Sequence, residues 1–171
     1  MDFQTYKTLA AISAKVPHRE HLYYLSGLLS EAEEFAKNPN ALEVGDLCWY
    51  WTILTNYCFN LDLSLFELKV TKQDYSTVGL NYFLTKAIQL TDAQNKLRRA
   101  EYHASIGDEK DKREAKFALL LGSTIKPILE QFGAVLAMVC NENFTSVEEV
   151  LKLNIRKLYD RFGLPIPKEA L

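Results

Sequence analysis

The chain has 171 residues, of which 48% are hydrophobic and 25% charged, a composition typical of one globular domain over 1–171. Its net charge of −2 argues against a general affinity for nucleic acid, which requires a basic face. No stretch approaches the roughly 20 uncharged apolar residues of a membrane span, and the first residues lack the basic and apolar regions of a signal peptide. We therefore expect a cytoplasmic protein with neither a membrane nor a nucleic-acid partner.

Three cysteines lie scattered among apolar residues, at Cys48, Cys58 and Cys140. Their odd number and irregular spacing favour buried free thiols in a reducing compartment. The chain has three histidines and no Cys-x-x-Cys motif, so a zinc site is not expected.

The hydrophobic periodicity is helical along almost the whole chain. Apolar residues predict a helix over 22–36, which ends at the break Asn38-Pro39-Asn40. Asn40 is placed to cap a second helix that runs to about residue 59. A short helix is expected over 62–72.

The second half of the chain continues this pattern. We expect long helices over 78–104 and 117–139, the latter with a kink near 122–127. A final helix over 146–162 is ended by Gly163. No alternating strand pattern with hairpin turns is present, so the predicted class is all-α, a helical bundle of roughly five to seven helices.

Two segments of the chain are faintly similar. The run from Cys58 to Lys69 is similar in kind to the run from Cys140 to Leu151. Two interpretations stay open. Either the chain is an internally duplicated, pseudo-dimeric helix-hairpin unit, or its amphipathic helices look alike by chance.

Two pairs of acidic residues flank the break between the first two helices. Glu31 with Glu34, and Glu43 with Asp46, are each spaced i, i+3, so both members of a pair leave one side of their helix. The short break makes the two helices antiparallel neighbours, which can bring the pairs face to face. Four carboxylates form an all-oxygen cluster suited to Mg²⁺, with Mn²⁺ as a substitute.

Apolar surroundings strengthen the metal interpretation of these acids. Glu31 lies in line with Leu28 and Phe35, and Asp46 lies in an apolar seam of its helix. Burying a carboxylate costs several kcal/mol unless a cation or a donor compensates. The alternatives are that Glu43 closes a capping box and that Glu34 is solvated. A ferritin-like di-iron site is excluded because no Glu is followed by His three residues later.

The last predicted helix carries a polar cluster of Asn154, Lys157 and Arg161. Their spacing of three and four residues places them on one face. An amide, an ammonium and a guanidinium together suit contacts to phosphate and sugar. The alternative is a solvated basic face.

Three segments together resemble a known family. Residues 27–35 and 42–50 resemble the Glu-x-x-Glu … Glu-x-x-Asp signature of the MazG-like all-α nucleoside triphosphate pyrophosphohydrolases. Residues 154–162 resemble that family's closing Asn-x-x-Lys-Leu-x-x-Arg-aromatic motif. The three motifs come in the family's order.

The resemblance implies Mg²⁺-dependent hydrolysis of a (deoxy)nucleoside triphosphate to the monophosphate and pyrophosphate, in nucleotide-pool control. It implies that the catalytic metal ligands are Glu31, Glu34, Glu43 and Asp46, and that Asn154 and Lys157 contact sugar or phosphate. Relatives in this family are oligomers, so we expect a homodimer or a dimer of dimers.

Further substrate contacts are expected from Arg161, Trp49 and Lys126. Trp49 is a candidate to hold the base, although core packing is its alternative role. Lys126 is a candidate phosphate contact.

One departure from the family motif bears on catalysis. Many relatives have a further Glu where this chain has Ser30. If that Glu assists the base, water activation here must come from the metal alone or from another acid such as Glu33. Ser30 also favours the rival hypothesis of a catalytically inactive helical module that binds nucleotide or another protein.

Overall fold

The computed structural model describes residues 1–15, 17, 20–68, 82–105 and 118–171. Over these ranges the chain forms α-helices and no strand, which confirms the all-α class and the expected helix number. The helices are α1 Phe3–Ser13, α2 His21–Lys37, α3 Ala41–Ile53, α4 Tyr82–Ser105, α6 Lys126–Asn143 and α7 Val147–Arg161.

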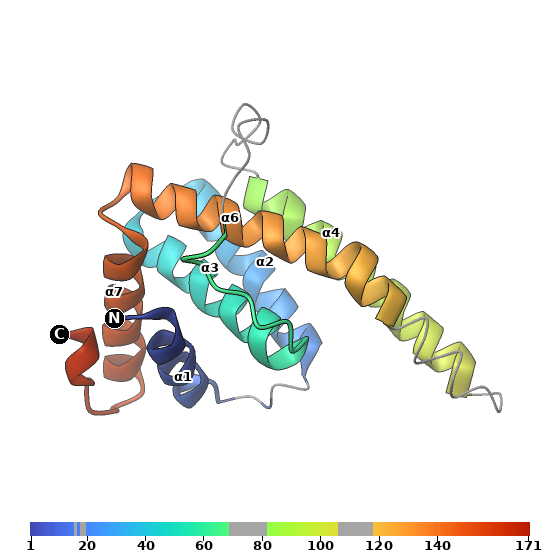
Figure 1. Cartoon of the computed structure of the whole chain (residues 1–171), viewed down its shortest axis with the longest axis horizontal. Helices are drawn as coiled ribbons and strands as arrows, with labels where there is room; N and C mark the ends of the chain where they lie inside the picture. The colour runs from blue at the N-terminus through green and yellow to red at the C-terminus, as the bar shows by residue number, and fades with distance from the viewer. Residues whose placement is uncertain (16, 18–19, 69–81, 106–117) are drawn as a thin grey trace.

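The helices form an elongated bundle with α7 standing across one end (Figure 1). α2 and α3 are joined by the short break at 38–40 and lie side by side as the antiparallel pair expected from the sequence. α4 and α6 run along each other and extend past this pair, whereas α1 lies against α7 and α3. α7 is thereby brought against the start of α3, where the second acid pair lies.

Side-chain caps fix the starts of α3 and α7 as the sequence predicts. The side chain of Asn40 accepts hydrogen bonds from the backbone N–H groups of Leu42 and Glu43, at 2.9 and 3.1 Å. Ser146 accepts from the backbone N–H of Glu149 at 3.2 Å. After α7, Gly163 takes a positive φ of 63°, the left-handed conformation that favours glycine at a helix end.

A helix that the periodicity analysis did not anticipate, α1, opens the chain. Asp2 caps it by accepting from the backbone N–H of Thr5 at 2.8 Å. Its inner face buries Phe3, Tyr6 and Ala10 in the common core. The capping pair and the apolar spacing were the available signals, but one short helix of 11 residues gives few periods to detect.

The short helix expected over 62–72 is wrong over the residues that the structure describes. Residues 65–67 form a single turn, and 69–72 lie outside the described ranges. Asn60 and Asp62 have positive φ angles of 53° and 47°, so the chain leaves the helical region before this segment. Of the helix expected over 78–104, residues 82–104 are helical in α4, and 78–81 lie outside the described ranges.

Two π-helical segments adjoin the long helices. η1, Leu54–Cys58, continues α3, and η3, Leu121–Ile125, precedes α6. The kink expected near 122–127 coincides with η3. The two segments that looked like a repeat differ in structure, because Ser146 starts the 15-residue α7 whereas Ser64 starts only a turn. Duplication therefore stays a hypothesis.

The helix that contains α6 is long and apolar. The helix Ala118–Asn143 has 26 residues, and its most apolar window of 18 residues has a mean hydropathy of 1.2. Of that window, 39% is buried. Length and composition alone would let this helix cross a membrane, but the core helix of a soluble protein meets the same criteria. α6 packs against α3, α4 and α7, and the expectation of no membrane partner stays a prediction.

Candidate metal and anion site

The α2–α3 pair brings three of the four predicted acids together. One carboxylate oxygen each from Glu31, Glu43 and Asp46 lies within 4.8 Å of the others. Glu31 and Glu43 are half-buried and Asp46 is 9% exposed. We call these three residues the acid triad. The sequence prediction that the two helices place their acids face to face is confirmed for these three.

Glu34 lies outside the triad. Its side chain is exposed one turn beyond Glu31 on α2, and the hydroxyl of Ser30 donates to it at 3.5 Å. Its charge still acts on the site, because it raises the pKa of Glu31. As a metal ligand Glu34 stays a prediction.

α7 supplies two donors to the innermost acid. The side-chain amide of Asn154 donates to Asp46 Oδ1 at 2.9 Å, and the ammonium of Lys157 forms an ion pair with Oδ2. Gly45 makes this approach possible, since a Cβ there would lie 3.1 Å from Cβ of Asn154. Two of the three residues predicted from the closing motif therefore meet the acid triad directly.

Asn154 is engaged on both sides of its amide. It is 1% exposed, and its carbonyl oxygen accepts a hydrogen bond from the hydroxyl of Tyr6 on α1 at 3.1 Å. This arrangement leaves Asn154 inside the protein, next to Asp46, and not at the surface where the expected contact to sugar or phosphate would occur. Tyr6 was missed in the sequence because α1 itself was not anticipated.

Burial and mutual repulsion raise the pKa values of two acids of the triad. Burial raises the pKa of Glu31 from 4.5 to about 7, and the charges of Asp46 and Glu34 add to this. The pKa of Asp46 is also raised, because burial outweighs the hydrogen bond and charge of Lys157. A cation bound near these carboxylates would offset this cost in free energy.

The other predicted substrate contacts have different positions. Arg161 is exposed in the last turn of α7, and its charge reaches Asp46 and lowers that carboxyl's pKa. Trp49 is 8% exposed, and its indole N–H donates to the carbonyl of Ala10 and the hydroxyl of Ser13. Trp49 thus packs in the core, as its alternative role required. Lys126 is at the surface of α6, where it lies 3.8 Å from Glu130 on its own helix.

Tyr50 borders the triad. It crosses α2 at Gly27, where a Cβ would lie 2.0 Å from its ring. Burial raises its pKa, and the charges of Glu31 and Asp46 raise it further. The hydroxyl is therefore protonated at neutral pH, next to a negative site.

The triad fits a hard divalent cation. Three carboxylates give the all-oxygen donor set that Mg²⁺ and Mn²⁺ prefer. Ligand oxygens of an octahedral Mg²⁺ site are about 3 Å apart when adjacent and about 4.2 Å apart when opposite, so the three oxygens, which lie within 4.8 Å of one another, would have to move closer together around an ion. Each Asp46 oxygen keeps a second lone pair beyond its present hydrogen bond.

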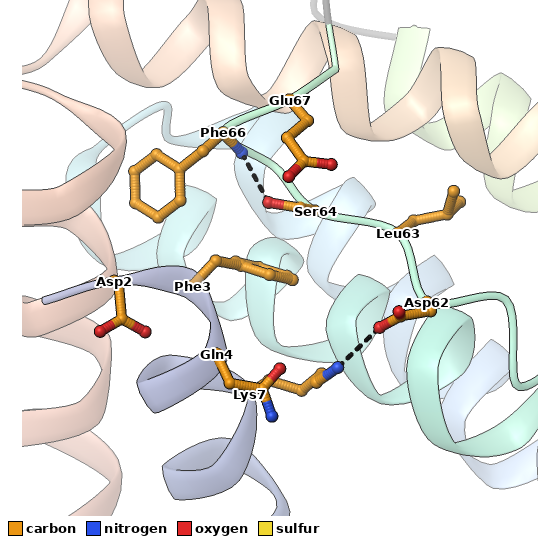
Figure 2. A pocket seen from close by; sticks show the side chains of 9 residues that line it. All are labelled: Asp2, Phe3, Gln4, Lys7, Asp62, Leu63, Ser64, Phe66 and Glu67. Atoms are coloured by element: carbon orange, nitrogen blue, oxygen red, sulfur yellow. Dashed lines mark hydrogen bonds and ion pairs between the residues drawn. The ribbon is translucent and has the colours of Figure 1, made fainter.

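A pocket of about 350 Å³ lies elsewhere, between the start of α1 and the segment 62–67 (Figure 2). Phe3 and Phe66 flank it, and an ion pair between Lys7 and Asp62 at 2.8 Å closes one side. No triad residue lines this pocket.

Comparisons of the chain with protein-family models, curated proteins and solved structures give no match.

Proposed function

We propose that this chain is a Mg²⁺-dependent nucleotide pyrophosphohydrolase, which converts a (deoxy)nucleoside triphosphate into the monophosphate and pyrophosphate. The observation that carries the proposal is the convergence of Glu31, Glu43 and Asp46 within 4.8 Å, beside a lysine from α7. The resemblance of the same residues to the MazG-like motifs supports the reaction type. We place the activity in the cytoplasm, in control of the nucleotide pool.

In this proposal the acid triad holds the metal, and Glu34 is placed to join it from the next turn of α2. The chemistry supplied by Mg²⁺ bound there is neutralisation of phosphate charge and activation of a water molecule. Mn²⁺ would substitute for it.

The chain's own cations act on the phosphates. Lys157 lies at the triad, and Arg161 lies four residues further along α7 with its guanidinium exposed. Positive charge on this helix would hold the triphosphate and stabilise negative charge on the departing pyrophosphate. Lys126, which pairs with Glu130 on its own helix, stays a candidate phosphate contact.

The proton from the attacking water needs an acceptor other than residue 30. The hydroxyl of Ser30 donates a hydrogen bond to Glu34. Glu33 is exposed and pairs with Lys37 at 2.6 Å, which lowers its pKa and makes it a weaker base. These contacts argue against Ser30 and Glu33 as the proton acceptor.

The experiment is a pyrophosphate-release assay with the four ribonucleoside and four deoxyribonucleoside triphosphates, with and without Mg²⁺. We expect release from at least one substrate, dependent on the metal. Glu31→Gln and Asp46→Asn should lower the rate by roughly a hundred-fold or more, whereas Glu142→Gln, on the exposed end of α6, should not.

No release from any substrate in the presence of Mg²⁺ would favour the inactive binding module. Near-normal turnover in both triad variants would remove the metal assignment, even if the chain is an enzyme.

A further inference from the structure

A chain of hydrogen bonds runs from α1 through α7 to the acid triad. Tyr6 donates to the carbonyl oxygen of Asn154 at 3.1 Å, and the amide nitrogen of Asn154 donates to Asp46 at 2.9 Å. The three residues are 0%, 1% and 9% exposed, in that order. Water therefore has little access to replace any link.

The direction of both hydrogen bonds is fixed by chemistry. Asp46 is paired with the ammonium of Lys157, so its carboxylate accepts and does not donate. The NH₂ group of Asn154 must then face Asp46, which turns its carbonyl oxygen toward Tyr6. The tyrosine hydroxyl is the only one of the three groups left to act as donor there.

Loss of the Tyr6 hydroxyl would release this orientation. The carbonyl oxygen of Asn154 would be buried without its donor, which is unfavourable. Rotation of the amide by half a turn would instead place that oxygen against the carboxylate of Asp46, where two acceptors repel. In the first case the amide is no longer held in one orientation, and in the second Asp46 loses its amide donor.

We propose that Tyr6 is a positioning residue of the metal site. It sets the amide of Asn154, and through that amide it holds the carboxylate of Asp46 in the orientation that a divalent cation requires. Asn154 then serves the site through Asp46 and not by contacting sugar or phosphate. This inference rests on the proposed function, and it makes α1 part of the site.

The relay resembles the outer partners that orient metal ligands in other proteins, whose removal costs about 10- to 100-fold in metal affinity or activity. It also explains why α7 approaches α3 so closely at Gly45. A larger residue there would push Asn154 away from Asp46.

The test compares Tyr6→Phe with Tyr159→Phe in the full chain. Tyr159 is 4% exposed and donates from α7 to the carbonyl of Leu9 on α1 at 3.3 Å, so its loss removes a hydrogen bond between the same two helices without touching Asp46. Mn²⁺ affinity is measured by electron paramagnetic resonance, and the thermal midpoint by calorimetry. Exchange of the Asn154 side-chain amide protons is followed by NMR.

We expect Tyr6→Phe to weaken Mn²⁺ binding roughly ten-fold and Tyr159→Phe less than about two-fold, with comparable losses of thermal midpoint. The Asn154 amide protons should exchange faster only in Tyr6→Phe. Asn154→Leu, which keeps the shape but not the donor, should weaken Mn²⁺ binding as well. Adding Tyr6→Phe to it should then have no further effect on affinity.

Equal Mn²⁺ affinities in the wild type and Tyr6→Phe would overturn the relay while leaving the metal site in place. Additive losses in the double variant would overturn it too, since two independent contributions would then act on Asp46. Failure of the wild type to bind Mn²⁺ would instead remove the proposed function, and the relay with it.

Discussion

The raised pKa of Glu31 should make the stability of the protein depend on pH when no metal is added. Burial and neighbouring acids raise its pKa from 4.5 to about 7. The folded state therefore holds a proton that the unfolded state has released between these values. By linkage, the stabilisation is complete below about pH 4.5 and is lost as the pH rises through 7.

We expect wild type to lose thermal stability relative to Glu31→Gln as the pH is raised from 4.5 to 8 without metal. The glutamine keeps the shape and has no proton to lose, so the difference between the two proteins isolates this one group. Adding Mg²⁺ at pH 8 should raise the wild-type midpoint and leave the variant's nearly unchanged. A constant difference across this range would mean that Glu31 titrates normally.

Lys157 should affect substrate turnover and metal binding in opposite directions. It pairs with Asp46, so it would compete with a bound cation as much as it assists an anion. Lys157→Ala should therefore lower kcat/KM for the triphosphate by about ten-fold or more, while Mn²⁺ binding to the free protein holds or improves.

The matched control is Lys152→Ala. Lys152 lies on α7 with its ammonium bound to Glu148 and Glu149, at 3.2 and 3.1 Å, and it should be close to neutral in both measurements. Small and equal effects of the two substitutions would show that Lys157 contributes no more to substrate binding than a solvated surface lysine.

Some residues of the site could be predicted from the sequence and others could not, because only some of them follow a recognisable sequence pattern. Glu31, Glu43 and Asp46 repeat at helical spacing on two helices joined by a short break, so their meeting follows from local geometry. Tyr6 carries no such pattern. It lies 148 positions from Asn154, and only the packing of α1 against α7 brings the two together.

At the scale of elements, the contact of α3 with α7 depends on the absence of a side chain at Gly45. A Cβ there would lie 3.1 Å from Cβ of Asn154, and Asn154 is held by two hydrogen bonds. Gly45→Ala gains about 1 kcal/mol of helix propensity, but we expect a net loss of stability because Asn154 has no free direction in which to move.

Gly122→Ala is the control for this prediction, since a Cβ at Gly122 meets nothing within 4 Å. It should hold or raise the thermal midpoint, whereas Gly45→Ala should lower it and also weaken Mn²⁺ binding. A gain of stability and unchanged metal affinity in Gly45→Ala would show that α7 tolerates displacement from α3.

Where a capping residue was recognised in the sequence, the helix end was predicted well, whereas α1, whose cap Asp2 was not recognised, was missed. Asn40, Ser146 and Gly163 mark their helix ends with local hydrogen bonds or backbone conformation. The segment 62–68 contains similar residues, but the left-handed backbone at Asn60 and Asp62 turns the chain away from a helix. That choice is made by packing and is not visible in the spacing of apolar residues.

At the scale of the whole molecule, α4 and the helix 118–143 extend beyond α2 and α3 (Figure 1). Their exposed apolar side chains include Ile88 and Leu119, at 54% and 66% exposure. We predict a homodimer or a dimer of dimers, since symmetric association buries such surface. Light scattering at micromolar concentration checks this, and a fully active monomer would contradict it.

The fold class could be predicted because helical periodicity extends over most of the chain, but the arrangement of the helices could not. The antiparallel α2–α3 pair follows from a three-residue break. The position of α7 across the end of the bundle depends on tertiary contacts, such as that between Gly45 and Asn154. The meeting of the acid triad was thus easier to predict from the sequence than the packing of Asn154 and Lys157 against Asp46.

In the proposed reaction, water attacks the α-phosphorus of a nucleoside triphosphate at the acid triad. The most direct measurement is mass spectrometry of the products formed with Mg²⁺ in ¹⁸O-labelled water. We predict one ¹⁸O atom in the monophosphate and none in the pyrophosphate, with both products formed about a hundred-fold more slowly, or slower still, by Asp46→Asn. Label in released phosphate or pyrophosphate, or no turnover of any triphosphate by the wild type, would contradict the claim.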